Sequence, residues 1–249
     1  MPPAPGPALL VNINNTWTKF CPLVGGRLGR IERCLTRDLQ PAFLRRIQRR
    51  HPGHPLVVCS VVPQARKLLD QVWPAKQLLD LDHRNLPGIK IKYPRPKQIG
   101  ADRLANTVAV CHLHPLPAIV VDLGTALTFD IISSRAEYLG GVIAPGLQAF
   151  TDYLHERTAL LPRVKLTRPS RAVGKSTREA ICIGAFHGYR GLVQEVLSQV
   201  RAELGSKNAT VITTGGDCLM MKGALKGVDV VDPLLGLRGL KIVAHHLLG

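Results

Sequence analysis

The sequence is short of acidic residues, of aromatic residues and of long apolar runs. Its 249 residues contain 17 Asp and Glu against 33 Lys and Arg, a formal net charge of +16, so we expect a surface that favours anionic partners. Aromatic residues make up only 4% of the chain, which argues against a surface that stacks the bases of single-stranded nucleic acid. No apolar run approaches the roughly 20 residues of a membrane helix, so no membrane-spanning segment is expected.

The six cysteines are scattered along the chain and form no CxxC pair. Prolines interrupt the amino-terminal residues 1–8, which are therefore a poor secretion signal. We expect a cytoplasmic protein with reduced and mostly buried thiols. The length is sufficient for one large domain or for two of about 100 to 150 residues each, and the 45% of hydrophobic residues supply a core.

Short apolar runs alternate with longer helical patterns, which is typical of an α/β fold. We expect strands at residues 9–13, 55–62, 89–93, 118–123, 125–132 and 209–214. We expect helices at residues 64–73, 101–111, 177–204 and 237–248. The prolines at positions 115 and 117 interrupt the preceding helix, which predicts a first domain over residues 1–117 and a second over residues 118–249.

Both halves of the chain open with an apolar strand that ends in a polar turn containing threonine, at residues 11–16 and 121–125. Such a turn holds backbone N–H groups and a hydroxyl around an anion, and an acidic residue at the strand end can hold its metal. An ordinary hairpin turn has the same composition, so both interpretations stay open for either turn alone. No GxxxxGK[ST] loop is present, and we discount the glycines of residues 25–29 because we expect no buried strand before them.

A carboxylate and a guanidinium, Asp102 and Arg103, stand side by side at the expected start of a helix. Asp102 is either a first-turn residue that interacts with the helix dipole or the acceptor of a proton from a substrate hydroxyl. Arg103 is either its exposed neighbour or the partner of an anionic part of the substrate. Spacing alone favours neither interpretation.

Eight segments in this order resemble the type III pantothenate kinases, which belong to the acetate and sugar kinase, heat-shock ATPase and actin superfamily. The segments are residues 14–19, 93–106, 122–130, 140–146, 155–162, 174–177, 214–216 and 232–239. The resemblance spans nearly the whole chain and implies two duplicated ribonuclease H-like domains of the actin-like ATPase type, with an active cleft between them. It also implies ATP-dependent phosphorylation of pantothenate to 4′-phosphopantothenate, the first step of coenzyme A synthesis.

The resemblance implies roles for individual residues as well. Asp102 corresponds to the catalytic proton acceptor, and Asp122 to the ligand of a monovalent cation, K⁺ or NH₄⁺. The positions that correspond to substrate contacts are Tyr93, Gly100, Ala101, Arg103 and Thr177, with His155 and Arg157 supplied across the interface of a homodimer. The positions that correspond to the site for ATP, which Mg²⁺ accompanies, are Asn12, Asn14, Asn15, Thr16, Lys19 and Thr125.

The first turn departs from the family pattern, Asp-x-Gly-Asn-Thr-x-x-Lys, because Asn12 and Asn14 replace the Asp and the Gly. Asn14 is tolerable, since Asn adopts positive φ more easily than other residues with a Cβ. Asn12 is the larger change, because an amide oxygen brings no charge to Mg²⁺ or its bound water. We therefore expect weakened nucleotide binding or turnover. The alternative is a pseudokinase, a regulatory or binding protein of the same fold.

Four arginines fall within residues 45–50 on one expected helix, where they could follow the phosphates of a nucleic acid. No aromatic residue is interleaved with them, and Leu44 and Ile47 fit an ordinary amphipathic helix with a solvated basic face. We therefore expect no specific nucleic acid partner, and no membrane association. The expected partners are pantothenate, ATP and a second copy of the chain.

Overall fold

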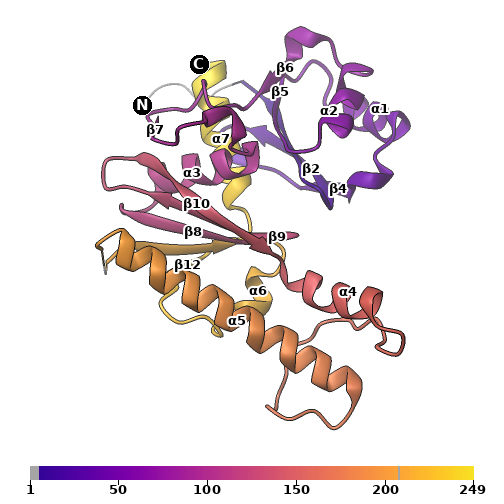
Figure 1. The fold of residues 1–249 in the computed structure, drawn as a ribbon. Helices are drawn as coiled ribbons and strands as arrows, with labels where there is room; N and C mark the ends of the chain where they lie inside the picture. Colours follow the sequence, from indigo (N-terminus) through magenta and orange to yellow (C-terminus); the bar gives the residue numbers. More distant parts are fainter. Residues whose placement is uncertain (1–5, 207) are drawn as a thin grey trace. The chain divides into compact units, whose positions relative to one another are not determined.

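The structure is a computed structural model that describes residues 6–206 and 208–249. Residues 1–5, part of the segment that argues against a secretion signal, lie outside the described residues. The chain divides into two compact units, which can be followed by colour in Figure 1. The first unit comprises residues 6–114, 136–138 and 234–249, and the second comprises residues 115–135, 139–206 and 208–233.

The first unit is built on a mixed sheet with the strand order β3-β2-β1-β5-β6, in which β4 also pairs with β2. The strands are β1 (Ala8–Ile13), β2 (Trp17–Val24), β3 (Arg27–Leu28), β4 (Glu32–Leu35), β5 (Leu56–Ser60) and β6 (Leu78–Asp80). Strand β1 runs antiparallel to β2 and parallel to β5. All six residues of β1 are buried, as expected for a central strand with helices on both faces of its sheet.

Two pairs of helices cover the two faces of this sheet. Helices α1 (Pro41–Arg50) and α2 (Pro63–Asp70) lie on the face to which Leu9 contributes, while α3 (Ala101–Leu113) and α7 (Leu235–Leu248) lie on the face to which Leu10 contributes. The unit also contains the short elements η1 (Thr36–Asp38), η2 (Ala75–Gln77), β7 (Lys90–Ile91) and η3 (Pro96–Gln98). Helix α7 ends the chain but packs on α3, so residues 234–249 belong to the first unit, whereas the sequence predicts a second domain that runs from residue 118 to residue 249.

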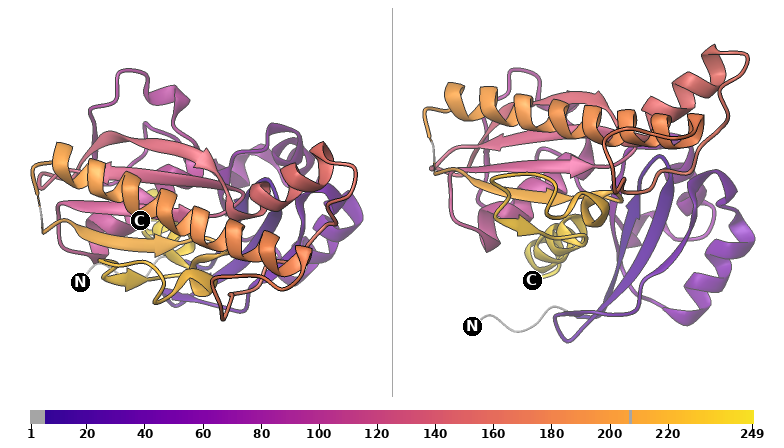
Figure 2. Two further views of the ribbon diagram at one scale, coloured as in Figure 1. Left: turned by 60° about the horizontal axis from the view of Figure 1, so that its bottom comes forward. Right: turned by 90° about the horizontal axis from the view of Figure 1, so that it is seen from below.

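The second unit is built on a sheet with the strand order β12-β11-β8-β9-β10. The strands are β8 (Ala118–Leu123), β9 (Ala126–Ile132), β10 (Glu137–Pro145), β11 (Thr210–Thr214) and β12 (Val230–Val231), and the helices are α4 (Leu147–Arg157), α5 (Thr177–Glu203) and α6 (Cys218–Met221). The first two residues of β10 belong to the first unit, where they pair in parallel with β7. Helix α5 runs along one face of the sheet (Figures 1 and 2), where Tyr189 and Leu197 pack in one buried cluster with Phe129.

All ten expected strands and helices occur, with bounds within three residues of those predicted. The reason given for discounting the glycines of residues 25–29 was wrong, because the largely buried strand β2 precedes them. They form the turn of an antiparallel hairpin in which Leu23 pairs with Leu28, and Gly25 and Gly26 have positive φ. The segment is therefore not a strand-to-helix loop for a dinucleotide. Within the described residues, no helix combines the length and the apolar composition needed to cross a membrane.

Candidate active site

The first polar turn lies between β1 and β2 and is fixed by a threonine from η1. Thr36 donates its hydroxyl to the carbonyl of Asn14 at 2.6 Å and its N–H to the carbonyl of Thr16 at 2.9 Å. Asn15 and Thr16 are exposed at the tip of the turn. Asn12 at the end of β1 stands opposite Lys19 on β2, so the turn brings the expected ATP-site residues of the first unit together.

Two amide oxygens in this turn have no hydrogen-bond partner among the described residues. The side chain of Asn12 is buried and its Oδ1 accepts no hydrogen bond, and the same holds for Oδ1 of Asn14. A Cβ placed on Gly236 of α7 would lie 3.5 Å from Nδ2 of Asn12 and 3.3 Å from Oδ1 of Asn106, so helix α7 closes over Asn12. A buried acceptor without a partner is costly, which makes these two oxygens candidates for contact with a ligand or its bound water.

The candidate proton acceptor lies at the amino terminus of α3. Oδ1 of Asp102 accepts the backbone N–H of Arg103 at 2.8 Å. Gly100 precedes the helix, and a Cβ there would come within 2.6 Å of the same oxygen, so a larger residue would displace the Asp102 carboxylate. Burial raises the pKa of the Asp102 carboxyl, against the opposing effects of the Arg103 N–H and guanidinium. A partly exposed carboxylate with a raised pKa is suited to accept a proton from a hydroxyl.

Two tyrosines stand next to Arg103. The Arg103 guanidinium lies 5.9 Å from the ring centre of Tyr138, and the rings of Tyr138 and Tyr93 meet edge to face at 6.3 Å. Both Tyr93 and Arg103 were predicted as substrate contacts, and the structure brings them together around Tyr138. Sequence reasoning missed Tyr138, because it lies in β10, a strand that was not predicted.

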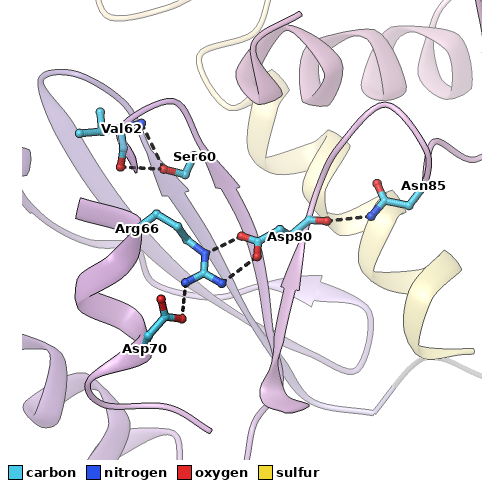
Figure 3. A network of polar contacts seen from close by, with 6 residues as sticks. All are labelled: Ser60, Val62, Arg66, Asp70, Asp80 and Asn85. Carbon is cyan, nitrogen blue, oxygen red and sulfur yellow. Dashed lines mark hydrogen bonds and ion pairs between the residues drawn. The ribbon is translucent and has the colours of Figure 1, made fainter. Parts of the chain in front are cut away.

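A polar cavity of about 310 Å³ opens beside Gly100 and Ala101 in the first unit. Its wall includes Asp82, His83 and Ser60. The walls are held by the hydrogen-bond network in Figure 3. In it Asn85 donates to the carbonyl of Asp80 at 2.7 Å, and the hydroxyl of Ser60 accepts the N–H of Val62 at 3.2 Å.

Helix α2 and strand β6 are joined in the same network by Arg66. Its guanidinium donates to both oxygens of Asp80 at 2.6 and 2.7 Å and to Asp70 at 2.8 Å (Figure 3). The pKa of Arg66 is raised, mainly by its hydrogen bonds to Asp80. This bidentate contact fixes the strand that leads into the cavity wall.

The second polar turn, between β8 and β9, is enclosed by two glycines of the second unit. A Cβ on Gly146 would clash with the carbonyl of Gly124, and a Cβ on Gly215 would clash with Oδ1 of Asp122. Gly146 also donates its N–H to the carbonyl of Thr125 at 3.2 Å. Asp122 and Thr125, predicted as cation and ATP contacts, are therefore approached closely by backbone, as a phosphate-binding turn requires.

Two further polar residues of the second unit surround Asp122, and sequence reasoning did not select either. The Tyr189 hydroxyl is fully buried and has no hydrogen-bond partner in the part of the chain that the structure describes, and its pKa is raised by burial and by the charges of Asp217 and Asp122. Burial also raises the pKa of Asp217, whose N–H donates to the carbonyl of Leu123 at 2.9 Å. Their positions along the chain gave no indication of this, because Tyr189 on α5 and Asp217 after β11 are far from Asp122 in sequence and come near it only when the chain folds.

The remaining predicted substrate contacts lie on α4 and α5. Thr177 is exposed at the first position of α5, directly after Ser176, which caps the helix by accepting the N–H of Glu179 at 3.2 Å. Thr177 also lines an apolar cavity of about 610 Å³ between α4 and α5. His155 and Arg157 are exposed at the end of α4 and do not line this cavity.

The described residues contain no group of three or more His, Cys, Asp or Glu side chains that could hold a metal ion. Magnesium keeps several waters and is often bound by one or two carboxylates together with substrate phosphates. In the first turn, the amide oxygens of Asn12 and Asn14 fit this mode, in which the nucleotide and its water supply the other ligands.

Comparison with known proteins agrees with the motifs. The family model described as type III pantothenate kinase matches residues 8–199. A type III pantothenate kinase of Methylacidiphilum infernorum is 41% identical over 241 residues, which cover 96% of this chain and 89% of the relative. One of Akkermansia muciniphila is 48% identical over 188 residues, which cover 76% of this chain and 77% of the relative.

The fold is shared with sugar kinases. A structure from Sinorhizobium meliloti described as a 2-dehydro-3-deoxygalactonokinase protein matches with a TM-score of 0.61 and 12% identity, and the match covers 96% of this chain and 99% of the other. The predicted fold class, α/β with domains of the actin-like ATPase type, is confirmed. The family match and the identities over most of the length establish that the chain belongs to the type III pantothenate kinase family.

Proposed function

We propose that this protein transfers the γ-phosphoryl group of ATP to the terminal hydroxyl of pantothenate and so begins coenzyme A synthesis. The observation that carries the proposal is the family membership together with a carboxylate of raised pKa, Asp102, at the start of α3. Phosphoryl transfer needs little covalent work from a protein, so catalysis rests on alignment and on stabilisation of spreading charge. The pseudokinase alternative finds no support in the comparisons.

In this proposal Asp102 accepts the proton of the attacking hydroxyl. Arg103 pairs with the pantothenate carboxylate, while Tyr93, Gly100 and Ala101 shape the site beside it. Thr177, His155 and Arg157 would complete the substrate site across a dimer interface.

The nucleotide is assigned to the two polar turns. We propose that Asn12, Asn14, Asn15, Thr16 and Lys19 contact ATP in the first unit, and that Thr125 does so in the second. Asp122 would hold the monovalent cation, K⁺ or NH₄⁺, and Mg²⁺ would bind chiefly through the phosphates and water. Both cations supply positive charge to the transferring group when bound.

The homodimer belongs to the same proposal. Tyr153 beside the apolar cavity of α4 and α5 is 64% exposed, and Leu160 in the following segment is 92% exposed. Apolar side chains exposed around a cavity mark a protein contact, and a second copy would cover them.

Light scattering of the purified protein is expected to give twice the mass of the 27.1 kDa chain, and Leu160→Asp is expected to shift the measured mass toward that of the monomer. A monomeric parent protein at micromolar concentration would contradict the dimer. We also propose that the protein is located in the cytoplasm.

The direct test is formation of 4′-phosphopantothenate by purified protein. ATP and other nucleoside triphosphates are supplied in turn with pantothenate and Mg²⁺, with K⁺, NH₄⁺ or Na⁺ present, and the product is identified by mass spectrometry. Release of ADP without pantothenate serves as the background. The proposal fails if no nucleoside triphosphate yields product under any of these conditions.

Asn12→Asp is expected to improve the use of magnesium nucleotide. A carboxylate accepts hydrogen bonds from metal-bound water more strongly than an amide, by about 1 kcal/mol, which corresponds to about fivefold. The Mg²⁺ concentration for half-maximal rate should fall by about this factor, and binding of Mg·ATP measured by calorimetry without pantothenate should tighten in parallel. Asn208→Asp, with the same charge change at an exposed position, is the control. Equal magnesium dependence in parent and variant would contradict the role of Asn12.

A further inference from the structure

The outer surface of helix α1 carries arginines that the proposed function does not use. Its apolar residues Leu44 and Ile47 are fully buried against the sheet of the first unit. At 100° per residue, the four arginines fall on one arc of the opposite, solvent side. We call this surface the arginine face, and it consists of Arg45, Arg46, Arg49 and Arg50, all exposed.

Carboxylates are almost absent around the arginine face. Residues 39–69 contain no Asp or Glu. Arg50 pairs with Glu32 of β4 at 2.6 Å, whereas no carboxylate of the described residues lies within ion-pair distance of Arg45, Arg46 or Arg49. The charge of the face is thus mostly uncompensated.

Arg66 of the neighbouring helix α2 is the contrast within the same unit. Its guanidinium is occupied by two carboxylates, Asp80 and Asp70, and serves the fold (Figure 3). Arg45, Arg46 and Arg49 make no ion pair with any carboxylate of the described residues, so ion pairing does not explain these three arginines. Arg46 is instead held over the ring of Phe43 at 4.7 Å, which orders the guanidinium while leaving its charge exposed.

We propose that the arginine face binds the phosphodiester backbone of nucleic acid without reading its sequence. Guanidinium groups bind phosphate oxygens in a bidentate way, and a helix spaces residues four apart by about 6 Å, so several phosphates of one strand can be met together. The expectation of no sequence-specific partner is unaffected, because backbone contacts carry no sequence information.

A polymer with many phosphates fits the face better than a membrane. Peripheral helices insert apolar side chains into the lipid, but the large apolar residues of α1 face inward, and none of residues 27–50 is an exposed large hydrophobic. Four cations along a helix of about 15 Å also exceed what one small anion can contact. Nucleic acid is therefore the favoured polyanion.

The test uses fluorescence anisotropy with the full-length protein and a labelled 20-base-pair duplex of random sequence, over a range of KCl concentrations. The variant combines Arg45→Gln, Arg46→Gln and Arg49→Gln. Its control combines Lys67→Gln, Lys76→Gln and Lys90→Gln, which are exposed positions in the same unit with the same loss of charge. Each phosphate contact contributes about 0.9 to the slope of log affinity against log salt, so the arginine variant should lose about 2.7 of that slope.

We expect at least tenfold weaker binding by the arginine variant at 50 mM KCl, at most twofold weaker binding by the lysine control, and unchanged phosphopantothenate formation by both. Unchanged melting temperatures show that the variants are folded. Three results overturn the proposal: no binding by the parent protein, an equal loss in both variants, or tighter binding to vesicles of anionic lipid than to the duplex.

Discussion

Asp102→Asn is expected to lower kcat for phosphopantothenate formation by about 10²- to 10⁴-fold, the usual contribution of a positioned general base. The amide keeps the size of the side chain and accepts the N–H of Arg103 as the carboxylate does at 2.8 Å, but it cannot take a proton from the substrate hydroxyl. The affinity for pantothenate, measured by calorimetry, should change much less than kcat, because Arg103, which we propose to pair with the pantothenate carboxylate, is unchanged.

The pH dependence of kcat/KM in the parent enzyme is a second test of Asp102 as the general base. Asp102 must be ionised to act as a base, and burial raises its pKa above the ordinary 3.8. The logarithm of kcat/KM should therefore fall as the pH drops through this raised pKa, at a higher pH than an exposed aspartate would give. A profile that stays flat down to pH 4 would contradict the assignment.

Stability distinguishes a chemical effect of Asp102→Asn from unfolding. A carboxyl whose pKa is higher in the folded than in the unfolded protein binds its proton more tightly when folded, so its ionisation at neutral pH lowers stability. The neutral asparagine should therefore leave the melting temperature at pH 7 unchanged or raise it. Asp70→Asn, an exposed carboxylate on α2, is the control and should retain activity. If both variants lose activity alike, Asp102 is not the base.

The fold could be predicted from the sequence where the signal is local. Strands such as β1 and β8 are short apolar runs that end in polar turns. Helix α5 is a long stretch of helical periodicity that follows a serine at its N-cap, so the positions of all three elements follow from nearby residues. Strand β10 was not predicted, and its glycines at 140 and 141 weaken the local strand pattern. Its pairing with β7 depends on residues about 50 positions earlier.

The candidate site likewise contains residues that can be predicted from local sequence and residues that cannot. Asp102, Arg103 and Asp122 were selected as candidates because their types and neighbours follow the family pattern at adjacent positions. Tyr138 and Tyr189 were missed because their places beside these residues arise from other strands and helices. A single sequence contains no record of which distant residues come into contact.

Gly239→Ala is expected to destabilise the first unit by about 3 kcal/mol, although it adds only one methyl group and alanine has the higher helix propensity. Helices α3 and α7 approach so closely at this point that a Cβ on Gly239 would clash with the backbone carbonyl of Ala105. Backbone cannot move aside as a flexible side chain can, so the two helices must separate. The thermal midpoint should fall by about 6 to 12 °C for a chain of this length.

Gly191→Ala is the matched control, because Gly191 lies in α5 and a Cβ there meets nothing within 4 Å. In that open position alanine should stabilise the helix by up to about 1 kcal/mol. Opposite signs for the same substitution would show that the contact with α3, and not helix propensity, decides the result at Gly239. Since Asp102 and Ala105 belong to one helix, Gly239→Ala should also lower kcat in the protein that remains folded. A melting temperature equal to that of the parent would mean that α7 does not pack on α3 at this distance.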